Sequence, residues 1–573
     1  MTASRAMAAS VALLSLALCA CDSILDLKDV ESIDETDVWN DAALAAAYVN
    51  KIYDDNLPGW STGDAGVSDE SPGGESYMYG QLTENSVNYW CIRSSSCANP
   101  PYDRIRRINI LLTEIDRGTI DTVVTKRMKG EGYFFRAWDY WELVKRYGGV
   151  PLILRPEALT DSLFVTRDST SKVMRQILAD LDSAIALLPV IRATSGGNDG
   201  HLHKGTAMSL KGRILLYYAS PQFNRTGDLT RWQNAYDANR AARDSLVSWG
   251  FGLYPDFAGL WFVDMNKEAI FVRRYQFPFS THTWAAATRP LSESQGSSGA
   301  NRPTWEMVQA FPMRSGRPIT DPTAGYDTLY FWKNRDPRFS ATIAYNGALW
   351  ELSGKKGRRQ WTYNGAESNN PTPSGFYTRK AVDPAVSAFD ASRGVTQWIE
   401  IRFAEVLLNL AEAANTIGNT PEAYDQLIAL RTRAGIDPGA GLYGLDPGMS
   451  GAQMQAAIML ERQIELAYEA KRSWDLRRNM LFESLLNGKK RHGLLITLNP
   501  DSAALFASIR DTMDLDSRYA GFFTHLVIDL DRTFSINWHA EYYFYAIPKD
   551  HINLNPKLQQ TMGWPNGTFD PLP

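Results

Sequence analysis

The chain has 573 residues, of which 44% are hydrophobic and 21% charged. This composition supplies a large core and excludes fibrous and disordered proteins. The 59 Lys and Arg against 64 Asp and Glu give a net charge of -5, and no long basic stripe is present, which argues against nucleic acid as a main partner. Many of the 17 Trp and 26 Tyr fall in segments rich in Gly, Pro, Ser and Asn, and loops are where binding residues are often found.

The N-terminus predicts a lipoprotein signal peptide over residues 1–20. Arg5 precedes an apolar run over residues 7–20, which is shorter than the roughly 20 apolar residues that a membrane span needs. The run closes on LCAC, which resembles the lipobox of bacterial lipoproteins. We therefore expect Cys21 to begin the mature chain and to carry the lipid anchor. The alternative is an ordinary secretory signal with a chance cysteine.

Two further cysteines remain in the mature chain. Cys91 and Cys97 lie close together in sequence, and in an exported protein such a pair closes a small loop as a disulfide. Two free thiols are the alternative. A zinc site is disfavoured because the sequence has no second pair of soft ligands.

Helical periodicity recurs along most of the chain. Phe134, Ala137, Trp138 and Trp141 repeat with the spacing of one helical face, and Gly148 follows them as a stop signal. Such segments come in pairs joined by short polar links. The pairs are 102–116 with 121–147, and 398–415 with 421–433. This pattern predicts a mainly α fold built from tetratricopeptide-like hairpins.

Two long segments interrupt the helical pattern. Residues 59–101 and 251–393 are rich in Pro, Gly, Asn and aromatic residues. Loops of this length usually carry function, and their aromatic content argues against disorder. We expect irregular, aromatic-rich loop insertions on the helical scaffold.

A series of sequence blocks runs in order from the first residues of the mature chain to its end. The blocks are CDSILDL (21–27), YDRIRRINILL (102–112), GEGYFFRAWDYWELVKRYGGVPLI (130–153), RDPRFSATIAYNG (335–347), IRFAEVLLNLAEAAN (401–415), ERQIELAYEAKRSWDLRR (461–478) and FYAIPKDHINLNPKLQQTMGW (544–564). Together they resemble the SusD/RagB family of nutrient-binding outer-membrane lipoproteins of Bacteroidetes. The resemblance implies an N-terminal helical region over 21–250 and a C-terminal region over 251–573, with the loop insertion 251–393 and helices over 398–490.

We interpret the charged residues of these blocks as structural. They flank apolar stripes, and we expect them to form ion pairs and helix-terminal bonds that fix how the hairpins dock. The spacing of Arg402 and Glu405 places them on one face of the expected helix. The residues concerned are Arg402, Glu405, Glu412, Glu461, Glu465, Arg472, Asp475 and Arg478.

No catalytic pattern stands out. A glycosidase needs two carboxylates across a cleft, and no such pair can be placed from the sequence; the nucleophile elbow of serine hydrolases and the phosphate-binding loop are absent. A metal on His201 and His203 is a weaker alternative to an exposed turn. We therefore expect a binding protein rather than an enzyme, with no metal and no cofactor.

Two clusters of aromatic and polar residues are the candidate ligand-binding residues. Aromatic rings on loops stack on the C–H faces of sugars, and neighbouring polar side chains bind the hydroxyls. Trp90 and Trp284 lead the two clusters, and burial of each ring in the core is the alternative. The resemblance implies that loops in these two parts of the chain hold glycan. The clusters are Tyr77, Tyr79, Asn88, Tyr89, Trp90 and Arg93, and Tyr275, His282, Trp284 and Arg289.

The leading functional hypothesis is a surface-exposed lipoprotein of the outer membrane that captures an oligosaccharide or polysaccharide. The resemblance alone implies its partner, a SusC-like TonB-dependent transporter over which it closes as a lid. Peptide capture, as in RagB-type members, is an alternative within the family. A secreted helical glycoside hydrolase and a hairpin scaffold without a small ligand are alternatives from other classes.

Overall fold

The computed structural model describes residues 35–90, 100–162, 164–191, 200–295, 299–367 and 371–572. The expected lipid site Cys21, the Cys91 and Cys97 pair and Arg93 lie outside these residues. Within the described residues, none of the helices combines the length and the apolar character that crossing a membrane requires.

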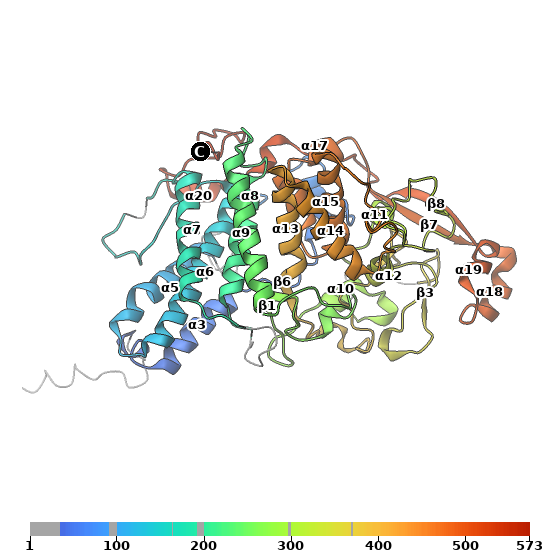
Figure 1. The fold of residues 1–573 in the computed structure, drawn as a ribbon, viewed down its shortest axis with the longest axis horizontal. Coiled ribbons are helices and arrows are strands. Elements are labelled where there is room, and N and C mark those ends of the chain that lie inside the picture. The colour runs from blue at the N-terminus through green and yellow to red at the C-terminus, as the bar shows by residue number, and fades with distance from the viewer. Residues whose placement is uncertain are drawn as a thin grey trace, which may run out of the picture.

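Long helices of the first half stand side by side as the helical scaffold (Figure 1). The expected pair over 102–116 and 121–147 is confirmed as α5 and α6, and α6 also packs on α7. Asp121 caps α6 by accepting from the Val123 N–H, and Gly148, with φ of 75°, ends it. The helices are α2 (Glu35–Val38), α3 (Ala42–Asn56), α4 (Glu75–Met78), α5 (Pro101–Glu114), α6 (Thr122–Tyr147), α7 (Thr170–Leu187), α8 (Lys204–Ala219) and α9 (Leu229–Ser248).

The scaffold continues in the second half of the chain with α13 (Phe403–Thr416), α14 (Thr420–Ala434) and α15 (Gly451–Glu465). Helix α13 packs on α9 on one side and on α14 and α15 on the other. The mainly α scaffold with consecutive helix pairs is therefore confirmed. Helix α15 ends at Glu465.

The helix expected over 398–415 starts later than the sequence predicted. Residues Trp398–Arg402 form strand β6, which pairs antiparallel with β1 (Ala269–Arg273) and aligns Phe271 with Ile401. A short apolar run with β-branched residues is compatible with a helix or a strand, and here pairing with β1 makes it a strand. Arg402 is consequently the last residue of a strand and does not share a helical face with Glu405.

The insertion 251–393 folds around a second core, to which residues outside the insertion such as Ile464, Leu494 and Phe506 also contribute. Its rings include Trp261, Trp305, Phe331, Phe339 and Trp361, all buried. Strands β2 and β5 pair, as do β3 and β4. The elements are α10 (Trp284–Thr288), α11 (Trp305–Ala310), α12 (Pro337–Thr342), β2 (Ile343–Ala344), β3 (Ala348–Leu349), β4 (Arg359–Gln360) and β5 (Tyr377–Thr378).

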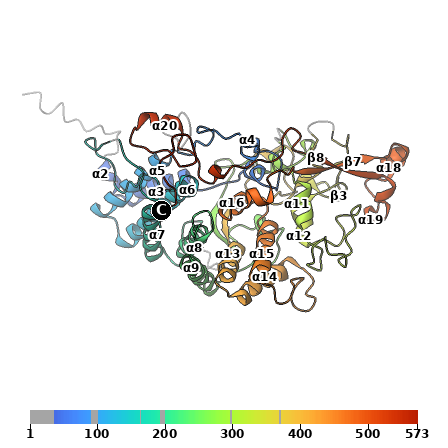
Figure 2. The same cartoon turned by 90° about the horizontal axis from the view of Figure 1, so that it is seen from above.

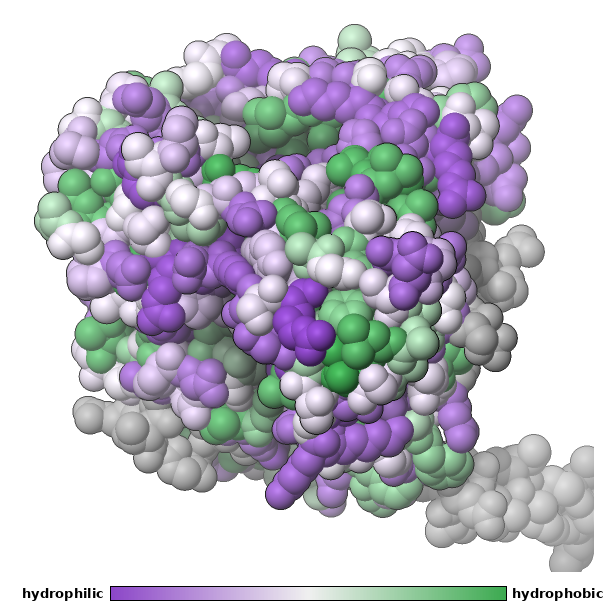
Figure 3. All heavy atoms as spheres, turned by 90° about the vertical axis from the view of Figure 1, so that its right-hand side faces the viewer, coloured by the Kyte–Doolittle hydropathy of each residue, from purple (hydrophilic) through white to green (hydrophobic). Residues whose placement is uncertain are grey.

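The last part of the chain reaches both ends of the molecule. Strands β7 (His492–Leu498) and β8 (Phe523–Asp529) form an antiparallel hairpin that projects with α18 and α19 (Figure 2). Seen from that end, apolar patches lie scattered among hydrophilic side chains (Figure 3). The final residues return to the first helices, where the Thr170 hydroxyl donates to the Pro571 carbonyl at 2.6 Å. The helices are α16 (Arg472–Arg478), α17 (Phe482–Leu485), α18 (Ala503–Ile509), α19 (Leu515–Arg518) and α20 (Lys549–Leu554).

Buried ion pairs join these parts, as the charged residues of the sequence blocks predicted. Each joins segments far apart in sequence or fixes the turn between α15 and α16. Arg402 binds Glu268, Glu465 and Glu469 at 2.6–2.8 Å and thereby ties β1, β6 and α15 together. The other pairs are Arg213–Glu405, Arg338–Glu461, Arg472–Asp69, Arg462–Asp475 and Arg478–Glu412.

Candidate ligand-binding site

The first predicted cluster packs against the main core. Trp90 is 5% exposed, with its ring between Tyr102 and Tyr147. The chain around it is held by side chains from distant segments, so protein already covers its ring faces. Ligand binding by this cluster stays a prediction. Tyr77 meets Tyr545, the Tyr79 hydroxyl donates to Asp531 at 2.7 Å, Asn88 lies 3.3 Å from His551, and Tyr89 lies under Arg146.

The second predicted cluster forms a small aromatic core. Trp284 is 1% exposed, stacks on Trp60 and donates its indole N–H to the Lys380 carbonyl at 3.0 Å. Burial lowers the pKa of His282 to about 4, so the ring is neutral at pH 7. Its Nε2 therefore donates to the Thr396 carbonyl at 2.9 Å, while Nδ1 accepts from the Trp284 N–H.

Arg289, the cation of that cluster, holds a neighbouring loop in place. It is buried and donates to the carbonyls of Val386 and Asp383. These bonds hold the segment 382–386 against α10. Since the same segment lines the two pockets described next, Arg289 fixes a wall and does not line either pocket.

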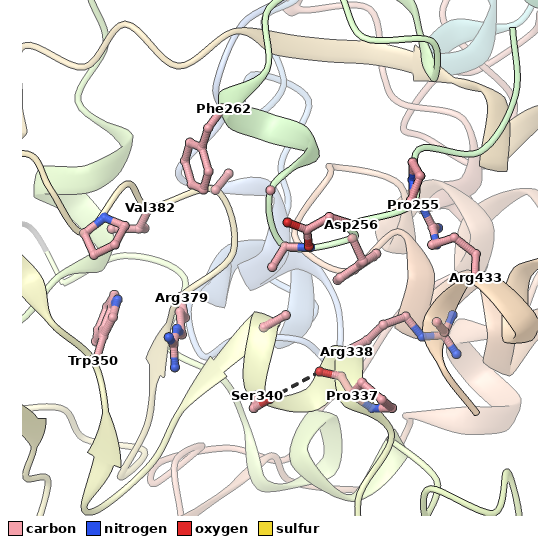
Figure 4. A pocket seen from close by; sticks show the side chains of 17 residues that line it. Pro255, Asp256, Phe262, Pro337, Arg338, Ser340, Trp350, Arg379, Val382 and Arg433 are labelled. Atoms are coloured by element: carbon pink, nitrogen blue, oxygen red, sulfur yellow. Dashed lines mark hydrogen bonds between the residues drawn. The ribbon is translucent and has the colours of Figure 1, made fainter. Parts of the chain in front are cut away.

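The larger of these two pockets, here the main pocket, has a volume of about 590 Å³ (Figure 4). This volume falls in the range of small-molecule sites. Its walls come from residues 255–262, the first turns of α12, Trp350, residues 379–384 and the end of α14. These segments are far apart in sequence, and the pocket forms only where the folded insertion packs against α14.

A second, smaller pocket, here the side pocket, adjoins the main pocket. Its volume is about 270 Å³, and Trp261, Tyr275, Gln397 and the Asp264–Arg274 ion pair are among its lining groups. Phe262 lines both pockets and is 43% exposed. An exposed ring thus stands at the boundary, and Tyr275 is the residue of the second predicted cluster that lines a pocket.

Unpartnered hydrogen-bond donors line both pockets. In the described part of the chain, the buried indole N–H of Trp350 and the buried Nε of Arg433 in the main pocket have no acceptor. The indole N–H of Trp261 in the side pocket has none either. Buried polar groups are nearly always hydrogen-bonded, and each missing bond costs about 1–3 kcal/mol. These atoms lie beneath the pocket walls with almost no accessible surface, so a ligand rich in oxygen acceptors satisfies them once the covering side chains shift.

The base of the main pocket is held by carboxylates from α15. Arg338 binds Asp336, Glu461 and Glu465, and Arg433 binds Glu268 and Glu465. These pairs neutralise two of the lining cations and fix their positions. Asp256, by contrast, lies exposed on the opposite wall, where one of its oxygens accepts from the Ala258 N–H.

A metal site is not apparent from the side chains that the structure describes. No group of three His, Cys, Asp or Glu side chains there is arranged to hold an ion. His201 lies beside Glu131, whereas His203 stacks on Phe251.

The residues that line the main pocket were not among those predicted from the sequence. Phe262, Trp350 and Arg379 lie inside the insertion that was expected to carry function, but nothing in their local sequence separates them from core residues. The block RDPRF was the available signal, because it contributes Pro337 and Arg338 to the pocket.

Family models match most of the chain in two pieces. A model of the SusD family matches residues 267–564, and a model described as starch-binding and associating with the outer membrane matches residues 29–216. Among curated proteins, SusD-like protein P38 of Formosa agariphila is 24% identical over 80% of this chain and 87% of its own length. SusD-like protein P2 of the same organism is also 24% identical, but the match spans only 64% of that protein.

Solved structures share the fold. A SusD-like protein of Bacteroides fragilis superposes with a TM-score of 0.73 at 22% identity, covering 93% of this chain and 99% of that one. A SusD-like carbohydrate-binding protein of the same species gives 0.71 at 21% identity, with 91% and 99% covered. A laminarin-binding SusD-like protein gives 0.54 at 20% identity, with 92% and 100% covered.

Proposed function

The chain belongs to the SusD family, and we propose that it is a lipid-anchored cell-surface protein that captures an oligosaccharide or polysaccharide in the main and side pockets. The resemblance inferred from the sequence blocks is thereby confirmed. The proposal assigns the chain a binding role without catalysis. Similar proteins described as carbohydrate-binding or laminarin-binding support glycan as the ligand class.

The observation that carries the proposal is the set of buried, unpartnered donors next to an exposed ring. Trp350, Arg433 and Trp261 offer N–H groups to acceptors, and Phe262 offers an apolar face. Sugars combine many oxygen acceptors with apolar C–H faces, so one ligand class satisfies both features. Asp256 adds an acceptor for sugar hydroxyl groups.

Calorimetric titration of the ectodomain, started after Cys21, with plant, host and microbial glycan fragments tests the proposal. Trp350→Phe keeps the ring and removes the donor, and we expect it to weaken binding by about 0.5–1.5 kcal/mol. Trp361→Phe is the matched control, because its indole N–H is also buried without a partner but lines neither pocket. Unchanged affinity in Trp350→Phe would remove the assigned site.

The panel also includes mixed peptides and a labelled glycan substrate. Binding of peptides alone would favour a RagB-type role, in which backbone hydrogen bonds replace ring contacts. Cleavage of the labelled glycan by the purified chain would make it a hydrolase. Intact glycan recovered from the complex is the result expected here.

The anchor and the partner are part of the same proposal. We propose that acylated Cys21 holds the protein in the outer membrane and that a SusC-like TonB-dependent transporter receives the glycan. Cys21→Ser should release the protein from the membrane fraction without changing glycan affinity in solution. Affinity purification of the tagged lipoprotein from outer membranes should recover the transporter. The disulfide between Cys91 and Cys97 stays a prediction, which thiol titration of the unfolded protein would settle.

A further inference from the structure

Among the cations that line the main pocket, Arg379 differs from the others in its contacts. Arg338 and Arg433 are bound by carboxylates, whereas Arg379 donates through Nη1 to the Leu349 carbonyl at 3.0 Å. Among the described residues no carboxylate comes within 4 Å of its guanidinium. The charge of Arg379 is therefore not neutralised by an ion pair.

The surroundings of Arg379 cover part of its side chain. This partial burial lowers the pKa of its guanidinium, and Tyr345 and Glu351 offset only part of the effect. A partly desolvated cation without a counter-ion is unfavourable, and an anion brought next to it stabilises it. The pocket thus favours negative charge at this position.

A second donor lies next to Arg379. The carbonyl that accepts from Arg379 belongs to Leu349, and the next residue is Trp350, whose buried indole N–H has no acceptor. Figure 4 shows the Trp350 and Arg379 side chains together on one side of the pocket. A carboxylate or a sulfate can accept from the Arg379 guanidinium there, and from the buried Trp350 indole N–H as well once that ring shifts toward the pocket.

We infer that this corner of the main pocket binds the anionic group of an acidic glycan, either the carboxylate of a uronic acid or a sulfate ester. The inference rests on the proposed function and narrows its ligand class. Asp256, across the pocket, disfavours a second anionic group there and accepts from hydroxyls instead. The glycan therefore binds with its acidic substituent toward Arg379.

Paired ligands provide the sharpest test. Titrations compare oligogalacturonides with the same oligosaccharides after reduction of their carboxyl groups, and chondroitin sulfate fragments with their desulfated forms. We expect one acidic member to bind and its neutral counterpart to bind about 10- to 100-fold more weakly, as loss of a charge-assisted hydrogen bond implies. The two pairs separate carboxylate from sulfate. Affinity should also fall as salt rises.

Protein variants provide the second arm. Arg379→Ala should weaken the acidic glycan to the level of its neutral counterpart, and Arg379→Lys should keep part of the affinity. Arg225→Ala is the matched control, because Arg225 likewise donates to a carbonyl and has its pKa lowered by burial, but lines neither pocket. Thermal unfolding verifies that each variant folds.

The outcomes separate this inference from the proposed function. If neutral glycans bind as well as acidic ones and Arg379→Ala weakens both equally, Arg379 is an ordinary hydroxyl ligand and the inference is wrong, while glycan capture stands. The same holds if only neutral glycans bind. If no glycan binds in any arm, both fail. The comparison of acidic with neutral glycans uses the unaltered protein. It therefore tests the inference even if a variant does not fold.

Discussion

The rings of Trp60 and Trp284 stack with their centroids 4.6 Å apart, and the buried Trp261 lies against the same Trp60 ring at 5.4 Å. Trp261 lines the side pocket, so the stack supports the floor of a candidate binding site from beneath. We expect Trp284→Ala to lower the free energy of unfolding by about 3–5 kcal/mol. Urea denaturation measures this loss.

Phe389→Ala is the control for that prediction. Phe389 is exposed on a neighbouring segment, so its removal should change stability by no more than about 0.5 kcal/mol. If Trp284→Ala kept full stability and still abolished glycan binding, the indole would be a ligand contact, as the sequence first suggested.

Arg478 and Glu412 form a fully buried pair at 2.6 Å that joins α16 to α13. Glu412→Gln leaves the cation with Asp475 as its remaining carboxylate partner, and we expect a loss of about 3–5 kcal/mol in the free energy of unfolding. A double variant, Arg478→Met with Glu412→Leu, should recover much of this loss because no charge stays buried alone. Urea denaturation of the unaltered protein and the two variants measures both changes. Equal stability of all three proteins would contradict the structural role.

Glu70 gives the stability a dependence on pH. Burial raises the pKa of its carboxyl to about 8 in the folded protein, against about 4.3 in an unfolded chain. The folded state therefore binds this proton more tightly than the unfolded chain does. The stabilisation of the folded state that results is fully present below about pH 4 and is lost as the pH rises through about 8. The free energy of unfolding changes by a few kcal/mol over this range, on the order of 1.4 kcal/mol for each pH unit between the folded and unfolded pKa of Glu70.

Glu70→Gln isolates this effect, because an amide oxygen can still accept from the Tyr468 N–H, as the carboxyl does at 3.1 Å. We expect the variant to match the unaltered protein near pH 5 and to exceed it in thermal stability at pH 9. Parallel melting curves over this range are the measurement. Identical pH profiles would show that the carboxyl titrates normally.

The adjoining pockets predict that affinity depends on ligand length. A short oligosaccharide fills the main pocket, and a longer one passes Phe262 into the side pocket. Phe262→Ala should therefore weaken long oligosaccharides by about 1–3 kcal/mol, the worth of a stacking ring, and short ones less. Phe164→Ala, at 48% exposure and outside both pockets, is the control. Calorimetry with oligosaccharides of increasing length is the measurement. An affinity that stops rising once the main pocket is filled would contradict the prediction.

The helical scaffold could be predicted from sequence because its signals are local. The periodic stripe ending at Gly148 marks α6 within a single segment. For Trp90 and Trp284 the sequence left burial and ligand contact as alternatives, since local sequence does not show which loop rings pack into a core. Trp350 and Arg379 converge only through strands β3 and β5, which are two residues long and carry no readable pattern. The position of these pocket residues depends on contacts between segments far apart in sequence, which local sequence patterns do not reveal.

The carboxylates of α15 that clamp Arg338 and Arg433 have an evolutionary consequence. The base of the main pocket is held to the scaffold by ion pairs, whereas the side chains of Asp256 and Phe262 on its rim take part in no ion pair among the described residues. Substitutions on the rim leave the foundation intact. Related proteins can therefore change their ligand specificity through substitutions at a few rim residues. The same asymmetry allows a new specificity to be engineered without redesign of the helical scaffold.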